Sequence, residues 1–164
     1  MDMTSRVPDN LTELLDKVVC FTTSRRTILY RNIREAQTLG FVPQDMPVGE
    51  FAQAMNEAVA EHLTRQRLLF RDTNNITFGP RGRMHVSPVV DEHAKSLLQT
   101  SHDEYLEHQI AKLMENSLNR AVAEDLLKIK AETLASSSSS QTGHAQSETD
   151  SNDGSSSPWD GCEQ

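Results

Sequence analysis

Residues 101–134 read SHDEYLEHQIAKLMENSLNRAVAEDLLKIKAETL, and this stretch decides the fold. Ser101 followed by Glu104 is a capping box, which predicts that a helix begins at residue 102. Leucines recur at seven-residue steps, at Leu106, Leu113, Leu127 and Leu134, with Arg120 interrupting the series. A seven-residue apolar repeat is typical of a coiled coil or an antiparallel helix pair. The sequence therefore predicts a long helix over 102–134 that packs against another helix.

The partner of that helix is expected near the N-terminus, over residues 10–37. Apolar residues recur there at steps of three and four, which indicates an amphipathic helix. Asn10 is the expected N-cap, with Glu13 completing a variant capping box, and Gly40 is the expected stop after the last turn. We expect the two helices to pack through Leu11, Leu14, Val18, Phe21, Ile28 and Leu29 on one side and Leu106, Ile110, Leu113, Asn116, Leu118 and Leu127 on the other.

The rest of the chain predicts smaller elements and a polar tail. Residues 50–67 carry a weaker amphipathic pattern and are expected to form a shorter helix. Residues 68–100 are expected to be extended or mobile, with a hairpin that pairs 68–70 with 76–78 around the turn at 72–75. Residues 136–164 open with five serines and stay polar and acidic, which predicts disorder. The expected fold is mainly α: a helical domain over residues 1–135, built as a two-helix rod, followed by this tail.

Composition excludes several classes of function. The net charge of −8 argues against a general nucleic-acid binder. No apolar run approaches the ~20 residues that a membrane span needs. The first residues, MDMTSRVP, lack an apolar stretch, so we expect synthesis in the cytoplasm without a cleaved signal peptide.

The chain also lacks the patterns of catalytic, cofactor and metal sites. Two cysteines are too few for a zinc-ligand set or a disulfide framework. His102 and His108 would lie on nearly opposite sides of one helix, so they could not share a metal ion there. Acidic residues occur as adjacent pairs whose side chains diverge, and no nucleophile motif is present. We therefore expect no enzyme, no cofactor and no metal, and the patterned helices favour an assembly protein.

Two segments resemble a known family. Residues 32–41, NIREAQTLGF, resemble the N-I-A-N-A-x-T-P-G-Y signature that closes the first helix of flagellar rod and hook proteins. The matching positions are Asn32, Ile33, Ala36, Thr38, Gly40 and the aromatic Phe41. Arg34, Glu35 and Leu39 depart from the signature. Residues 107–118, EHQIAKLMENSL, look like the E-x-x-M-A-K-L-A-E-N-x-L run in the last helix of the proximal rod proteins.

The resemblance implies a structural subunit of the proximal rod in the bacterial flagellar basal body. Such subunits pair their terminal helices and stack into a tube in the periplasm. Their partners would be other rod proteins, further copies of the chain and the junction with the MS ring. Export would run through the flagellar type III apparatus. The alternative is a cytoplasmic helical adaptor or regulator that dimerises through the helix at 102–134.

Overall fold

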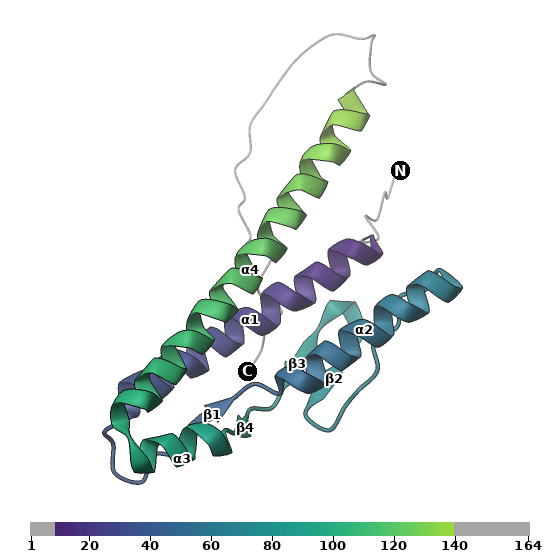
Figure 1. The fold of residues 1–164 in the computed structure, drawn as a ribbon. Coiled ribbons are helices and arrows are strands. Elements are labelled where there is room, and N and C mark those ends of the chain that lie inside the picture. The colour runs from purple at the N-terminus through teal and green to yellow at the C-terminus, as the bar shows by residue number, and fades with distance from the viewer. Residues whose placement is uncertain (1–8, 140–164) are drawn as a thin grey trace.

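A computed structural model describes residues 9–139 and confirms the mainly α fold that the sequence predicts (Figure 1). Residues 140–164, most of the predicted disordered tail, lie outside the described part. The elements in chain order are α1 (Asn10–Glu35), β1 (Gln44–Asp45), α2 (Val48–Arg65), β2 (Ile76–Phe78), the 3-10 turn η1 (Pro80–Gly82), β3 (Met84–Val86), β4 (Val89–Val90), α3 (Glu92–Thr100) and α4 (His102–Ser139). No helix among these residues is both long enough and apolar enough to cross a bilayer.

The two long helices run antiparallel, as predicted. Tyr105, near the start of α4, reaches Asn32 near the end of α1. Ala123, farther along α4, packs with Leu15 and Val19 near the start of α1. Because α4 has 38 residues and α1 has 26, the C-terminal end of α4 projects beyond its partner (Figure 1).

The main hydrophobic core lies between α1, α2 and the short sheet formed by β2 and β3. Phe21 of α1 stacks on Phe51 of α2 with ring centroids 4.0 Å apart. The short sheet formed by β2 and β3 closes this core with Ile76 and Met84. The prediction of a two-helix rod was therefore incomplete, since α1 also packs against apolar residues from the middle of the chain.

The middle segment differs from the prediction in three ways. Residues 68–70 form no strand, and β2 pairs with β3 instead, with Ile76 opposite Val86. Residues 92–100 form helix α3 rather than extended chain, because the Asp91 carboxylate caps it by accepting a hydrogen bond from the Ala94 amide at 3.0 Å. A second short ladder joins β1 to β4.

The predicted ends of the two long helices also differ from those in the structure. The N-cap of α1 is Asp9, whose carboxylate accepts from the Leu11 amide, while the Asn10 side chain contacts His62 instead. Helix α4 continues to Ser139 instead of ending at residue 134. The predicted stop at Gly40 was right about the conformation, because its φ is +76°, which an L-side chain would adopt only with strain.

Candidate functional site

The contact between α1 and α4 is centred on a buried asparagine. The Asn32 amide nitrogen donates to Gln109 Oε1 at 3.0 Å and to the carbonyl oxygen of Gln44 at 2.7 Å. Asn32 Oδ1 accepts from the Gln44 amide at 3.3 Å, and the Tyr105 hydroxyl donates to the carbonyl oxygen of Asn32 at 2.9 Å. All of these side chains except Gln44 are at most 1% exposed. One residue therefore ties together α1, the chain after the turn, and α4.

This network gives a physical role to the first residue of the predicted turn motif. Asn32 holds residue 44 against the end of α1, so the chain must reverse between them. Backbone hydrogen bonds from Thr38 to Glu35 and from Phe41 to Thr38 shape that reversal. The other motif positions contribute less: Ile33, Ala36 and Phe41 are half-buried, and Thr38 and Gly40 are exposed.

A second buried asparagine, Asn116, joins α1 and α4 further along α4. Asn116 of α4 donates to the carbonyl oxygen of Thr22 in α1 at 2.7 Å and is 1% exposed. The structure thus places this residue of the predicted packing surface between α1 and α4. A short side chain that donates to a partner's backbone lets two helices approach closely without an unsatisfied buried group.

A buried ionic cluster links four elements around the same contact. Arg25 of α1 makes two hydrogen bonds to Asp45 of β1, at 2.8 and 3.0 Å. Lys112 of α4 donates to Asp45 at 2.8 Å and to Asp91, the cap of α3. Burial alone would raise the pKa of Asp45, but the hydrogen bonds from Arg25 and Lys112 outweigh it and hold that pKa below its ordinary value.

The sequence did not lead us to predict this ionic cluster, although the position of Arg25 indicates it. Arg25 lies on the apolar face of its helix, four residues after Phe21 and three before Ile28. A charged residue at such a position needs a buried partner. The sequence does not tell which of its many carboxylates that partner is.

Only one leucine of the predicted heptad of α4 takes part in the contact: Leu127 is half-buried and packs against Leu15, Val19 and Ala123. Leu106 and Leu113 are also only half-buried, and Leu134 is 59% exposed. The other residues that face α1 are Tyr105, Gln109, Lys112, Asn116 and Ala123. Polar residues face inward because each one finds a specific partner on α1 or β1.

This orientation leaves an apolar stripe of α4 uncovered. Two residues of the predicted packing surface belong to it, Ile110 at 49% exposure and Leu118 at 64%. On α1, the predicted Phe21, Ile28 and Leu29 are buried, Leu14 and Val18 are half-buried, and Leu11 is 51% exposed. The other large apolar residues of the stripe are Met114, Val122, Leu126 and Ile129.

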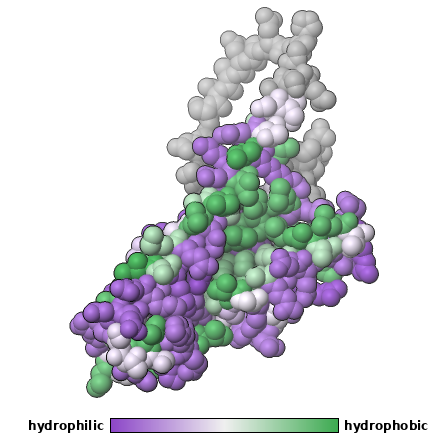
Figure 2. All heavy atoms as spheres, in the orientation of Figure 1, coloured by the Kyte–Doolittle hydropathy of each residue, from purple (hydrophilic) through white to green (hydrophobic). Residues whose placement is uncertain are grey.

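Part of the stripe forms one wall of an open groove. The groove has a volume of about 490 Å³ and lies between α4, α1 and the first half of α2. Its apolar lining includes Val18 of α1, Phe51 and Met55 of α2, and Leu118 and Val122 of α4. Figure 2 shows the hydrophobic band between α4 and α2. Exposed apolar surfaces of this kind occur at sites of protein, ligand or membrane contact.

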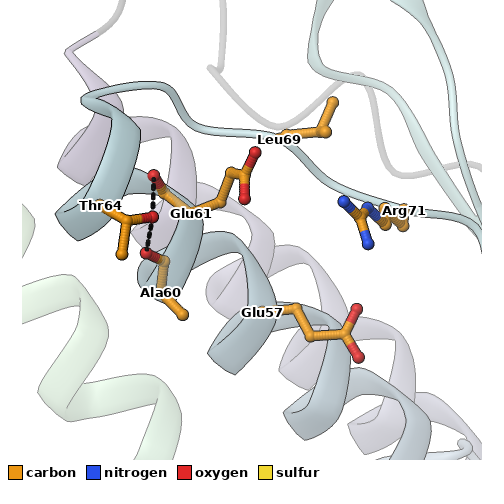
Figure 3. A pocket seen from close by; sticks show the side chains of 6 residues that line it. All are labelled: Glu57, Ala60, Glu61, Thr64, Leu69 and Arg71. Carbon is orange, nitrogen blue, oxygen red and sulfur yellow. Dashed lines mark hydrogen bonds between the residues drawn. The ribbon is translucent and has the colours of Figure 1, made fainter.

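A smaller pocket offers no comparable function. It has a volume of about 250 Å³ and is lined by Glu57, Ala60, Glu61, Thr64, Leu69 and Arg71 (Figure 3). The Arg71 guanidinium points across it from the chain after α2 toward the two glutamates of that helix (Figure 3). Within residues 9–139 no group of three or more His, Cys, Asp or Glu side chains is placed to hold a metal ion.

Comparison of the chain with protein-family models, with curated proteins and with solved structures found no match.

Proposed function

We propose that the chain is a structural subunit of the proximal rod of the bacterial flagellar basal body, which assembles by packing its helices against neighbouring rod subunits. The observation that carries the proposal is the uncovered apolar groove between α1, α2 and α4. Burial of apolar area contributes roughly 25 cal/mol per Å², so a neighbour that filled this groove would bind favourably.

The family-like residues support the same proposal. Asn32 and Asn116 fall in the two segments that resemble rod proteins, and both are buried between α1 and α4. They hold together the helix pair on which the groove depends. A subunit of this kind would work in the periplasmic rod, with other rod proteins, its own copies and the MS-ring junction as partners, after export through the flagellar type III apparatus.

The test replaces one groove residue and one control residue by aspartate. Leu118→Asp places a charge in the groove wall, yet Leu118 is already 64% exposed, so the isolated subunit should stay folded. Leu39→Asp makes the same change at a fully exposed leucine in the turn after α1. In a strain that lacks the gene, Leu118→Asp should abolish motility and incorporation into purified basal bodies, whereas Leu39→Asp should support both. Normal incorporation of Leu118→Asp would refute the groove as the assembly surface.

One observation favours the adaptor alternative: the apolar stripe of α4 continues past the groove to Ile129, which is 58% exposed. An adaptor that dimerises there should sediment as a concentration-dependent dimer that Ile129→Asp dissociates. It should also stay in the cytosolic fraction and be absent from basal bodies. A rod subunit should instead fractionate with basal bodies.

A further inference from the structure

A group of arginines without ion-pair partners lies around the β2–β3 hairpin. Residues 65–86 hold five arginines against one aspartate, a net charge of +4 in a chain whose net charge is −8. Arg65 pairs with Glu61 at 2.8 Å. In the described part of the chain the other four, Arg67, Arg71, Arg81 and Arg83, form no ion pair, and all are exposed. We refer to these four residues as the basic surface.

Two contacts bring its parts together. Phe70, next to Arg71, stacks on Phe78 at the end of β2 with ring centroids 5.1 Å apart. The turn that carries Arg81 and Arg83 closes with a hydrogen bond from the Gly79 amide to the carbonyl oxygen of Arg83 at 2.9 Å. The segment after α2 and the hairpin turn therefore lie side by side.

The turn is held by α1 in a conformation that costs energy. Arg81 has a φ of +59°, which a residue with a side chain adopts only with support from its surroundings. The Lys17 ammonium supplies that support by donating to the carbonyl oxygen of Gly82. The turn, fixed to α1 by this contact, thus presents Arg81 and Arg83 at the surface, whereas the Arg71 guanidinium faces Glu57 and Glu61 across the smaller pocket.

We propose that in the free subunit the basic surface binds the acidic segment 140–164 of the same chain. That segment contains Glu148, Asp150, Asp153, Asp160 and Glu163 and no lysine or arginine, so its net charge is −5. Single exposed ion pairs are weak, but several opposite charges that meet together on one surface act in concert.

The length of the chain favours an intramolecular contact. Helix α4 packs on α1 at the level of Lys17, since Ala123 contacts Leu15 and Val19, the residues two positions before and after Lys17. Ala123 is about 16 residues before Ser139, which corresponds to ~24 Å of helix. The next ~20 residues span up to ~70 Å when extended, enough to return along α4 and cross α1. A tether of this length gives an effective concentration near the millimolar range, which favours the chain's own segment over a second copy in dilute solution.

Trp159 is the chain's only tryptophan and lies within this segment, so it reports on binding in the full-length protein. In a reducing buffer, which prevents a disulfide between Cys20 and Cys162, its fluorescence anisotropy, excited where tyrosine does not absorb, should be well above that of a synthetic peptide of residues 140–164. Raising NaCl to about 0.5 M shortens the screening length to ~4 Å, and the anisotropy should fall most of the way to the peptide value.

Two charge variants test the pairing. The double variant Arg67→Glu, Arg83→Glu should lower the Trp159 anisotropy at low salt to the value that the wild-type chain reaches at high NaCl. The control, Arg26→Glu with Lys128→Glu, makes the same charge change at exposed sites outside the basic surface and should leave it unchanged. Replacing Glu148, Asp150 and Asp153 by Lys in the Arg67→Glu, Arg83→Glu protein should restore the anisotropy.

Three results would overturn the proposal. The first is an anisotropy that is already at the peptide value in the wild-type chain. The second is an anisotropy that rises with protein concentration, which would show that a neighbouring copy supplies the segment. The third is equal binding of phosphatidylglycerol vesicles by the wild-type chain and by a variant in which the five acidic residues of the segment are replaced by Asn or Gln. Equal binding would show that the segment does not cover the basic surface. Because all of these measurements use the isolated subunit, they do not depend on the proposed role in the rod.

Discussion

Replacement of Asn32 by alanine should destabilise the protein more than any other single polar truncation between α1 and α4. The side chain makes three hydrogen bonds, two to the backbone of Gln44 and one to Gln109, and it is 1% exposed. A hydrogen bond contributes about 0.5–1.5 kcal/mol net, and a buried partner left unsatisfied costs about 1–3 kcal/mol. Three hydrogen bonds at the first of these values give an expected loss of about 1.5–4.5 kcal/mol, a large share of the ~5–15 kcal/mol typical of a folded domain.

The assay is urea unfolding of the full chain followed by circular dichroism at 222 nm. Asn74→Ala, at an exposed asparagine in the loop before β2, is the matched control and should change the free energy of unfolding by less than about 0.5 kcal/mol. Gln109→Ala completes a double-mutant cycle with Asn32→Ala, and the two should couple by about 0.5–3 kcal/mol. A loss below about 1 kcal/mol for Asn32→Ala, or independent effects in the cycle, would refute the idea that this residue ties α4 to the turn.

Two further predictions concern the ionic cluster and the core. The pKa of Asp45 is lower in the folded chain than its ordinary value of 3.8, so the stability that this carboxylate contributes is present above that value and is lost as the pH falls through the folded pKa. Unfolding free energies measured between about pH 6 and pH 2 should therefore decline at the acid end, and Asp45→Asn should reduce that decline; an unchanged acid profile would contradict the assignment. Phe51→Ala removes the ring that stacks on Phe21 and should cost about 3–5 kcal/mol in the same urea assay, whereas Phe41→Ala, at a half-buried ring in the turn, should cost clearly less. Equal losses for the two phenylalanines would mean that the core does not lie between α1 and α2.

The sequence by itself determined the helices that build the frame. The spans predicted at 10–37, 50–67 and 102–134 correspond to α1, α2 and α4 within a few residues at each end. Periodicity, capping side chains and a glycine stop are local features, and a helix depends mainly on residues three and four positions apart. For the same reason, the helix stop at Gly40 could be predicted from the neighbouring residues in the sequence.

Tertiary structure decided which face of α4 packs and how the middle of the chain folds. Asn32 and Gln109 are 77 positions apart, and Lys112 is 67 positions from Asp45, so no local pattern reveals that they meet. The leucine repeat predicted an apolar contact, but the specific hydrogen bonds of Tyr105, Gln109 and Asn116 turned the polar side of α4 toward α1. The apolar stripe was left at the surface as a consequence, and the groove exists only because three helices meet there. In this orientation the buried polar side chains find hydrogen-bond partners, and that matters because a buried polar group left without a partner costs about 1–3 kcal/mol.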